Sequence, residues 1–483
     1  MTIRFEKSFG MTADMAHTGL TDLLEPHGQG HVLRFWKNLS ASSKKRLADQ
    51  VRSLDFGQIA HFQRLLKKAK SGKKEPFRLE PAEITRFAAT DEQKEADEQA
   101  VKIGVEALRR GRVGVFLVAG GQGTRLGFNG PKGCFPIGPV SRKSIFQMHA
   151  EKILAASGHY GAAIPWTIMT SRSNDSETRT FFEENGFFGL NPRDVFFVPQ
   201  RMAPCLDESG LLILDAPDHM AESPNGHGGA LLAMEDGGVL EESRKRGVDI
   251  LSYFQVDNVL IRIIDPLFIG HHLMRGADMS SKMVRKRGPS EKLGHFGLIG
   301  GRLHVIEYSD MTEADMKARN PDGSLKYEAG SIGIHLIRTD FVQRELNGGL
   351  KLPFHIAHKK IPFIDENGKT VNPVKPNGYK FETFIFDALQ NAAESLILEV
   401  RRGEEFSPVK NKDGEDSPET ARRDLSCMYL EWLEAAGMPV PPEASGDAEK
   451  AVEISPLFAI DRKALTVRRQ DIPPIRFPFY LYP

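Results

Sequence analysis

The spacing of the apolar positions changes near residue 110. Between about residues 15 and 87, apolar residues recur every three or four positions, as in "HVLRFWKNLSASSKKRLADQVRSL", and this is the spacing of amphipathic helices. Ser40 is placed to cap a helix that begins near Ala41. The charged segment "DEQKEADEQAVKIGVEALRRG" predicts a further helix that leads into the first strand. The amino-terminal part of the chain is therefore predicted to be mostly helical.

Short apolar runs with the character of buried strands follow. The first covers 113–118, and its lack of polar side chains is typical of a strand whose two faces are both covered. Later runs end near Thr170, Pro199, Asn258 and Ile337, and helical patterns at 143–156 and 176–184 lie between them. Strands that alternate with helices over long crossovers predict an α/β fold with a doubly wound, mostly parallel sheet. Ligands of such sheets bind at the carboxyl ends of the strands.

The pattern changes again after about Phe406. The segment "SPVKNKDGEDSPETARRD" is polar and rich in turn formers, and the tail "DIPPIRFPFYLYP" carries prolines among aromatic residues. We expect three regions. They are a mostly helical region at 1–105, a central α/β domain at 106–395 and a small carboxy-terminal domain at 396–483.

Composition and charge narrow the choice of partners and compartment. The chain has 64 basic and 64 acidic residues, so no charge bias points to nucleic acid or membrane. Its three cysteines lie far apart without disulfide or zinc spacing. The amino terminus lacks the apolar core of a signal peptide, and no run approaches the ~18 apolar residues of a membrane span. A cytoplasmic protein with small-molecule substrates is expected, and its oligomeric state stays open.

A glycine-rich loop follows the first predicted strand, in "FLVAGGQGTRLGFNGPKG" at 116–133. A Walker loop is disfavoured, because the Gly-Lys pairs at Gly72 and Gly368 lack both a preceding strand and the required earlier glycine. A dinucleotide fingerprint is disfavoured because Gly127 lies one residue too late for the third glycine. The segment "SRKS" stands where a ribose-binding carboxylate belongs, which leaves an NADP-dependent oxidoreductase as a second hypothesis.

Nucleotidyl transfer explains more of this loop. Without side chains at Gly120, Gly121 and Gly123, backbone amides can approach a triphosphate closely. Arg125 and Lys132 add positive charge beside that cradle. Attack of a sugar phosphate on the α-phosphorus builds up negative charge, and fixed cations stabilise it.

The loop also resembles a known family signature. "LVAGGQGTRLG" followed by "PKG" is similar to the UDP-sugar pyrophosphorylases, and "PKGCFPIGPVSRKSIFQMHAEKI" looks most like the UDP-N-acetylglucosamine branch. The likeness continues through "LRFWKNL", "VDNVLIRIIDPLFIGHHLMRGAD", "VIEYSD", "KPNGYKFETFIFD" and "EFSPVKN" and covers most of the chain. It implies a nucleotide-diphospho-sugar transferase fold and an Mg²⁺-dependent uridylyltransferase. Such an enzyme forms a UDP-sugar and pyrophosphate from UTP and a sugar 1-phosphate.

The resemblance also assigns roles to residues. Arg125, Lys132 and Lys410 are implied to bind phosphates in the catalytic centre, and Asp257, at the end of a predicted strand, to hold Mg²⁺ beside the nucleotide. The implied nucleotide-binding residues are Leu117, Ala119, Gly120, Gly121, Gly123, Thr124, Gln200 on the uracil edge and Gly226 against the uracil ring. The amide of Gln200 suits a base edge because it offers a donor and an acceptor together. The missing side chain of Gly226 is expected to leave room for the base.

The sugar pocket departs from the N-acetylglucosamine pattern. Glu307 matches a ligand of a sugar hydroxyl, but His227 and Ser331 stand where that branch usually has asparagine. The fragment "GHG" is similar to UDP-glucose pyrophosphorylases instead. N-acetylglucosamine 1-phosphate is the first expectation, and glucose 1-phosphate or a broad specificity is the alternative. Lys380 is a weaker phosphate-binding candidate, placed at the start of a helix expected over "KFETFIFD".

A third hypothesis is a non-catalytic nucleotide-sugar sensor. It predicts the loss of phosphate ligands, whereas Arg125, Lys132, Asp257 and Lys410 are all present.

Overall fold

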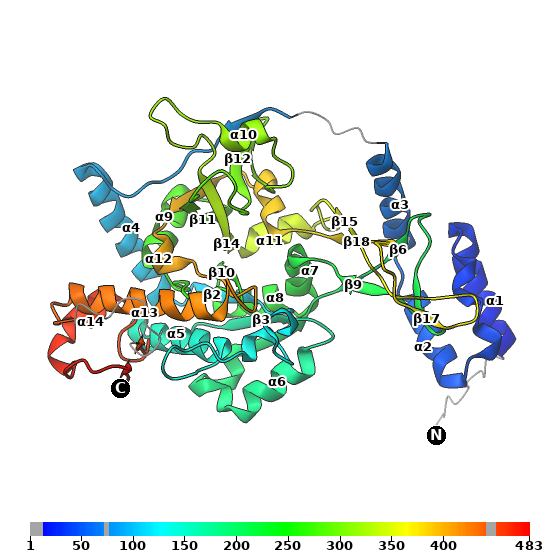
Figure 1. Cartoon of the computed structure of the whole chain (residues 1–483), viewed down its shortest axis with the longest axis horizontal. Helices are drawn as coiled ribbons and strands as arrows, with labels where there is room; N and C mark the ends of the chain where they lie inside the picture. Colours follow the sequence, from blue (N-terminus) through cyan, green and yellow to red (C-terminus); the bar gives the residue numbers. More distant parts are fainter. Residues whose placement is uncertain (1–12, 72–76, 441–450) are drawn as a thin grey trace, which may run out of the picture. The chain divides into compact units, whose positions relative to one another are not determined.

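The computed structural model describes residues 13–71, 77–440 and 451–483 (Figure 1). The chain divides into two compact units, and each is assembled from stretches that are distant in sequence. The smaller unit comprises Met1–Pro76, Arg201–His227 and Pro353–Phe384. The larger unit comprises Phe77–Gln200, Gly228–Leu352 and Ile385–Pro483. The three sequence regions expected above cut the chain differently, and their limits stay a prediction.

The larger unit is built on a sheet that has ten strands within the described residues. Its main path runs β1-β12-β14-β10-β2-β3-β4. The bounds on this path are β1 Leu79–Pro81, β12 His295–Ile299, β14 Ala329–Arg338, β10 Ile250–Gln255, β2 Val113–Val118, β3 Trp166–Thr170 and β4 Val195–Pro199. The other strands are β11 Met279–Arg285, β13 Arg302–Ile306 and β19 Ser395–Glu399.

The half of the sheet that carries the glycine loop is parallel. Strands β10, β2, β3 and β4 pair in parallel in that order, whereas β14 runs antiparallel to β10. Strand β2 consists of apolar residues and glycine, and Val115, Phe116 and Leu117 have no exposed surface. A run of this kind forms a central strand because both of its faces are buried.

Helices cover the sheet of the larger unit. They are α4 Asp91–Arg109, α5 Ile145–Tyr160, α6 Asp175–Glu184, α7 Ala230–Asp236, α8 Val239–Arg246, α9 Pro266–Arg275, α10 Glu313–Lys317, α11 Thr339–Leu346, α12 Arg402–Glu405, α13 Pro418–Ala435 and α14 Arg462–Val467. Helices α4 and α9 approach backbone to backbone, because a Cβ on Gly104 would lie 1.9 Å from the carbonyl oxygen of Pro266. Helix α4 forms where the charged segment predicted it, and Thr90 closes a capping box at its start.

The carboxy-terminal elements share the core of this sheet. Buried side chains of β2, α5 and α13 belong to one hydrophobic cluster, which includes Leu117, Phe146 and Leu425. A parallel pair of short strands, β20 Val452–Ile454 and β21 Phe479–Leu481, joins the same cluster through Val452 and Phe479.

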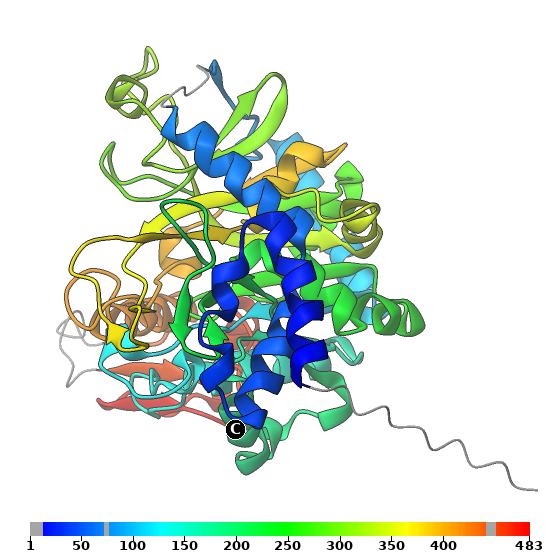
Figure 2. The same cartoon turned by 90° about the vertical axis from the view of Figure 1, so that its right-hand side faces the viewer.

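The smaller unit combines the amino-terminal helices with short strands. Helices α1 Ala13–Leu24, α2 Ala41–Arg52 and α3 Phe56–Lys70 are the blue helices in Figure 2. The strands are β5 Met202–Pro204, β6 Leu206–Asp207, β7 Leu214–Ala216, β8 His219–Met220, β9 Glu222–Pro224, β15 His355–Lys359, β16 Phe363–Ile364, β17 Thr370–Val371 and β18 Gly378–Glu382. Phe62 of α3 stacks on Phe381 of β18 with ring centroids 3.8 Å apart. The predicted Ser40 cap is confirmed, since its side chain accepts a hydrogen bond from the Ser43 amide.

The prediction of a helix that starts at Lys380 is wrong. Lys380 lies in β18, where it pairs with Ala357 of β15. Phe381 is fully buried between the half-buried Lys380 and Glu382, and this alternation has the period of a strand rather than of a helix. The positive helix end that supported a phosphate contact at Lys380 is therefore absent there.

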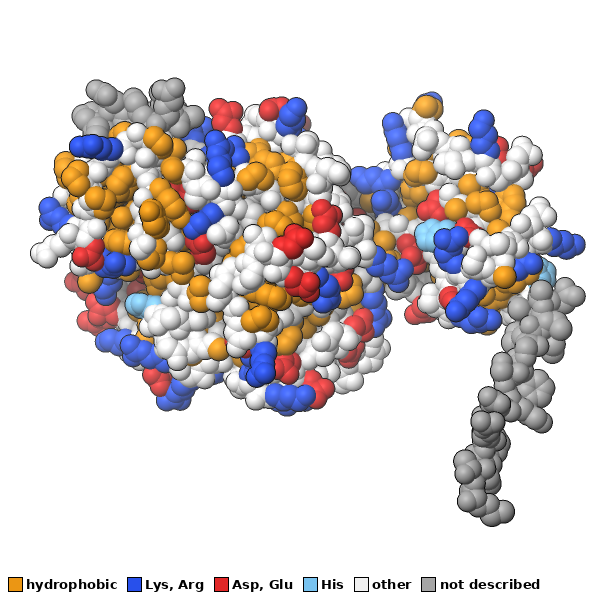
Figure 3. Space-filling model, turned by 90° about the horizontal axis from the view of Figure 1, so that it is seen from below, with side chains coloured by type: hydrophobic (Ala, Val, Ile, Leu, Met, Phe, Trp, Pro, Cys, Tyr) orange, Lys and Arg blue, Asp and Glu red, His pale blue; other side chains and the backbone are white. Residues whose placement is uncertain are grey.

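The surface agrees with the balanced composition. On the face shown in Figure 3, basic and acidic side chains are interspersed. In the described parts of the chain, no helix combines the length and the apolar character that a bilayer crossing requires.

Candidate functional site

Several predicted site residues follow strands that end at one edge of the larger unit's sheet. Val118 of β2 pairs with Gln255 of β10 and with Met169 of β3, and Thr170 of β3 pairs with Pro199 of β4. The carboxyl ends of the four strands are thereby in register. The residues that come next are Ala119 and Gly120 after β2, Gln200 after β4, and Asp257 two positions after β10. This is the edge at which parallel sheets bind their ligands.

The glycine loop closes on itself directly after β2. The Gly123 amide donates to the carbonyl of Gly130 at 2.8 Å, and the Lys132 amide donates to the carbonyl of Gly121 at 3.1 Å. A Cβ on Gly123 would lie 2.7 Å from the Phe128 ring, so only glycine fits there. Thr124 and Arg125 are exposed in the short turn Thr124–Leu126. The loop thus presents its backbone and a cation to solvent while its own fold is tightly fixed.

Gln200 lies against this loop. A Cβ on Gly120 would be 2.9 Å from Oε1 of Gln200, so glycine is needed for the two residues to approach. Gln200 is only 6% exposed, and its backbone N–H donates to the carbonyl of Thr170 at 2.9 Å. Leu117, by contrast, is buried in β2 with its side chain in the core, and its backbone is paired between the neighbouring strands β10 and β3.

Lys132 and Asp257 face each other at the same edge. Their Nζ and Oδ2 atoms are 3.9 Å apart, and their side chains are 15% and 13% exposed. A cation at the end of the glycine loop and a carboxylate just after β10 therefore lie close together.

The segment that carries Lys410 is bonded to this edge. The Val409 amide donates to the carbonyl of Asp257 at 2.9 Å. Asn258 donates through Nδ2 to the carbonyl of Glu405 at 2.7 Å and accepts at Oδ1 from the Ser407 amide at 3.1 Å. Nζ of Lys410 itself lies 3.6 Å from Oδ2 of Asp416. The backbone contacts place Lys410 one residue beyond the point that touches Asp257.

A buried ionic cluster anchors the start of that segment. Lys282 has no exposed surface, and its Nζ lies 2.9 Å from Oδ2 of Asp265 and forms an ion pair with Glu405. Burial opposes ionisation of Asp265, but the cations Lys282 and Arg262 outweigh it and lower the pKa of this carboxyl to about 2. Removing one member of such a cluster leaves an unpaired buried charge, so its members are mutually dependent.

Two of the sugar candidates converge on Gly294. The Ser331 amide donates to the carbonyl of Gly294 at 2.8 Å, and a Cβ on Gly294 would lie 3.8 Å from Oε1 of Glu307. Both side chains are half-buried. The structure therefore brings Glu307 and Ser331 to the same place in the larger unit.

The remaining candidates, Gly226, His227 and Lys380, belong to the smaller unit. The ring of His227 stacks on Phe384 with centroids 5.1 Å apart, and His355 also stacks on Phe384 at 4.4 Å. Burial and the neighbouring His355 lower the pKa of His227 to about 4. The imidazole is therefore neutral near pH 7 and offers one donor and one acceptor.

The reason predicted for Gly226 is wrong. Its φ is +82°, and a Cβ would lie 2.4 Å from the carbonyl oxygen of Thr383. The space left by the missing side chain is thus taken by the backbone of Thr383 and is not open for a base. A contact of Gly226 with uracil stays a prediction.

Sequence reasoning missed two asparagines that hold the site together. Asn174 is 1% exposed, and its Nδ2 donates to the carbonyl of Ala119 at 2.9 Å, which fixes the start of the glycine loop. Asn258 ties the Lys410 segment as described above. An asparagine before a helix or after a strand suggests only a local cap or turn, so neither long-range partner could be read from the sequence.

The family comparison agrees with this geometry. Residues 59–416 match the family model described as UTP–glucose-1-phosphate uridylyltransferase. The chain belongs to this uridylyltransferase family. It is 37% identical, over 92% of its length and 94% of the relative, to human UDP-N-acetylhexosamine pyrophosphorylase-like protein 1. It is 35% identical to the UDP-N-acetylglucosamine pyrophosphorylase of Saccharomyces cerevisiae, with 85% of this chain and 90% of that protein covered.

A solved structure confirms the fold of the uridylyltransferase chain. The UDP-N-acetylglucosamine pyrophosphorylase of Trypanosoma brucei, solved with an inhibitor, aligns over 99% of both chains with a TM-score of 0.80 and 28% identity. The predicted family, α/β fold and enzyme class are thus confirmed. The NADP-dependent oxidoreductase is disfavoured, because the relatives are named as pyrophosphorylases.

Proposed function

We propose that this chain transfers a uridylyl group from UTP to an N-acetylhexosamine 1-phosphate and releases pyrophosphate. The observation that carries the proposal is the meeting of Lys132 and Asp257 beside the glycine loop, with the Lys410 segment bonded to Asp257. The choice of an N-acetylated sugar is supported by the relatives, which are named for N-acetylhexosamine or N-acetylglucosamine.

The reaction needs charge and position rather than a protein nucleophile. A phosphate oxygen of the sugar 1-phosphate attacks the α-phosphorus of UTP in line, the new P–O bond forms, and the bond from the α-phosphorus to the bridging oxygen breaks. The electron pair leaves with pyrophosphate. Arg125, Lys132 and Lys410 neutralise the phosphate oxygens as negative charge grows, which is the main way a preorganised site lowers such a barrier.

The nucleotide is held by the glycine loop and Gln200. Backbone amides of Gly120 and Gly121 and the hydroxyl of Thr124 bind the phosphates, whereas Gly123, whose amide donates to the carbonyl of Gly130, holds the shape of the loop around them. The backbone from Leu117 to Ala119 lies along the nucleoside. The Gln200 amide pairs with the uracil edge, and Gly226 lies against the ring. Gln200 supports this role because it is nearly buried yet packs directly on Gly120.

The carboxylate of Asp257 fits a Mg²⁺ site in which substrate phosphates supply most of the remaining ligands. Among the described residues, no group of three or more His, Cys, Asp or Glu side chains could hold a metal on protein ligands alone. Mg²⁺ commonly uses one or two carboxylates together with substrate phosphates, and Asp257 stands beside the proposed phosphate site. The ion would supply charge stabilisation on the phosphates. Asp257 would hold it, and Lys132 would share the charge neutralisation.

Three polar side chains are proposed to select the sugar. Glu307 accepts from a hydroxyl, while Ser331 and the neutral imidazole of His227 contact the substituent that distinguishes hexoses. A site built on hydrogen bonds discriminates strongly, because a wrong sugar leaves its polar groups unpaired. His227 favours glucose 1-phosphate as the second candidate, since histidine replaces the asparagine expected for the N-acetyl sugar.

A substrate panel tests this proposal. Pyrophosphate release is measured with UTP and the 1-phosphates of N-acetylglucosamine, N-acetylgalactosamine, glucose and galactose. We expect turnover with the N-acetyl sugars, and His227→Asn should raise their kcat/KM relative to glucose 1-phosphate. Turnover with glucose 1-phosphate alone would overturn the N-acetyl preference, and binding of UTP without any turnover would favour the sensor.

The cysteines support a cytoplasmic location, which we also propose. Cys134, Cys205 and Cys427 are all free thiols. Burial and the nearby Glu177 raise the pKa of Cys134 to about 12, so this thiol is unreactive. Unpaired cysteines are typical of a reducing compartment.

A further inference from the structure

Gln255, the last residue of β10, ends in a carboxamide that has no hydrogen-bond partner within the described ranges. Its backbone is paired with Val118 of β2, and its side chain is half-buried. Asp257, the proposed Mg²⁺ ligand, follows two residues later. A carboxamide offers a donor and an acceptor together. Both groups are therefore available to a ligand beside the proposed substrate site.

The Gln255 side chain lies over the neighbouring strand β14. The pairing of β10 with β14 ends at Tyr253 and His335. Two residues farther on, in the same antiparallel register, Gln255 comes opposite Gly333. A Cβ on Gly333 would lie 3.5 Å from Nε2 of Gln255, which is ordinary contact distance. The end of the Gln255 side chain therefore rests against the backbone of β14.

Gln255 and Ser331 lie on the same face of the sheet. Ser331 and Gly333 are half-buried and alternate with buried residues, which is the period of a strand. The side chains of the opposite face belong to the hydrophobic cluster of this sheet, and they are Phe254 and Val256 beside Gln255 and Ile332 and Ile334 in β14. Diagonal neighbours on paired strands lie about 7–8 Å apart, a distance that a long side chain spans. Gln255 can therefore reach a group that Ser331 contacts.

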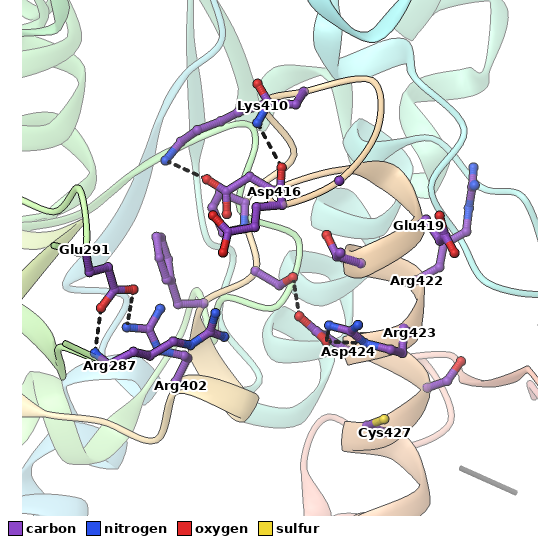
Figure 4. A pocket seen from close by; sticks show the side chains of 18 of the residues that line it. Arg287, Glu291, Arg402, Lys410, Asp416, Glu419, Arg422, Arg423, Asp424 and Cys427 are labelled. Carbon is purple, nitrogen blue, oxygen red and sulfur yellow. Dashed lines mark hydrogen bonds and ion pairs between the residues drawn. The ribbon is translucent and has the colours of Figure 1, made fainter. Parts of the chain in front are cut away.

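The Ser331 side of this pair leads to the proposed phosphate site. Figure 4 shows Lys410 on the wall of a cavity of about 1070 Å³. Leu293 lines the same cavity, and the next residue, Gly294, accepts from the Ser331 amide. A Cβ on Gly294 would lie 3.8 Å from Oε1 of Glu307. One part of the cavity thus carries a proposed phosphate ligand, and another adjoins the residues proposed for the sugar.

We propose that Gln255 is a specificity-determining residue that binds the acetamido group of the N-acetylhexosamine. This inference rests on the proposed function. The carboxamide accepts from the N–H of the acetamido group and donates to its carbonyl, whereas glucose has a single hydroxyl in that place. Ser331 and Gly333 carry a short side chain and none, so β14 leaves room for the bulk of the acetamido group next to Gln255.

Calorimetric titration of the full chain with UDP-N-acetylglucosamine and with UDP-glucose, in the presence of Mg²⁺, tests this role. Gln255→Met keeps the length of the side chain but removes its donor and acceptor. Gln255→Ser is studied alone and together with Ser331→Asn, which moves a carboxamide to the diagonal position on β14. The matched control is Gln343→Met, at an exposed position of α11 in the same unit. Thermal melting verifies that each variant is folded.

Gln255→Met should weaken the binding of UDP-N-acetylglucosamine about tenfold, as expected for the loss of one or two neutral hydrogen bonds. Its binding of UDP-glucose should stay close to that of the wild type. Adding Ser331→Asn to Gln255→Ser should restore most of the lost preference for the N-acetyl sugar, because the carboxamide returns to the same face. Gln343→Met should bind both UDP-sugars like the wild type.

An unchanged ratio of the two dissociation constants in Gln255→Met would overturn the inference. So would an equal loss for both UDP-sugars, which is the result expected of a purely structural residue, or a double variant that recovers none of the preference. These measurements need no turnover. The absence of pyrophosphate release with every sugar 1-phosphate would therefore contradict the proposed function, while the binding ratio still decides the role of Gln255.

Discussion

At the scale of single residues, the same amino acid is required for different physical reasons. Gly120 admits the Gln200 side chain, whereas Gly226 admits the backbone of Thr383 and also adopts a positive φ. Both glycines were candidates on the basis of a motif. Only the structure shows which neighbour makes each one necessary.

Gly226→Ala should therefore destabilise the protein far more than the same substitution at another glycine of positive φ where the added Cβ has free space. A Cβ there adds a contact of 2.4 Å with the Thr383 carbonyl to the backbone strain of about 1–2 kcal/mol. The matched control is Gly28→Ala in the same unit, where φ is +68° and nothing lies within 4 Å of the added Cβ. Thermal melting should show a clearly larger loss for Gly226→Ala, and equal melting temperatures would contradict the packing described here.

At the scale of elements, the site depends on how the Lys410 segment is attached to the end of β10. Asn258 provides two of the hydrogen bonds, to Glu405 and from Ser407. Its buried side-chain amide donates to this segment through Nδ2 and accepts from it at Oδ1. Asn258 is thus a positioning residue that acts through Lys410.

Asn258→Ala should lower kcat about 10–100-fold, because a displacement of about 1 Å in a phosphate-binding group is sufficient for such a loss. The KM for UTP should change much less, since Gln200 and the glycine loop stay in place. Asn258→Asp keeps the acceptor for Ser407 and should recover part of the activity. Asn320→Ala, which removes a local turn contact to Ser324, serves as the control. A wild-type kcat in a folded Asn258→Ala enzyme would show that the attachment is unimportant.

The elements also show what the sequence could predict. Strands β2, β3 and β4 and the loop after β2 were predicted correctly, because burial on both faces and glycine chemistry leave local patterns. The helix at Lys380 was wrong, since the apolar alternation around Phe381 was read with the wrong period. The partners of Asn174 and Asn258 lie 55 and 147 residues away, so no local pattern indicates them.

At the scale of the whole molecule, the units are assembled from distant stretches. Residues 201–227 and 353–384 join the amino-terminal helices, as the stacking of Phe62 on Phe381 shows. The sequence-based prediction places these stretches inside the central domain at 106–395, because a single sequence does not indicate which remote segments contact each other.

Buried histidines should make the folded protein sensitive to acid. Burial lowers the pKa of His149 to about 3 and those of His227, His272 and His295 to about 4, well below the value of about 6.5 in an unfolded chain. The unfolded state therefore binds more protons between pH 6.5 and 4, and stability falls as the pH is lowered through that range. Glu405, whose pKa is raised by burial, has the opposite effect but is a single group.

The melting temperature should accordingly drop between pH 7.5 and pH 5, before most carboxylates titrate. Asp265, whose pKa is lowered to about 2, loses its stabilising contribution only below about pH 4, so it does not account for a change between pH 7.5 and pH 5. A melting temperature that is constant or higher at pH 5 would contradict the burial of these histidines.

The most direct test of the account is the rate of pyrophosphate release by Lys132→Ala with UTP, Mg²⁺ and N-acetylglucosamine 1-phosphate. Lys317→Ala is the control, because Lys317 is an exposed lysine paired with Glu313 one helical turn away. Loss of the cation beside the glycine loop should lower kcat by at least about 10², while the melting temperature stays near that of the wild type. A folded Lys132→Ala protein with wild-type turnover would contradict the claim that this loop and its lysine carry out uridylyl transfer.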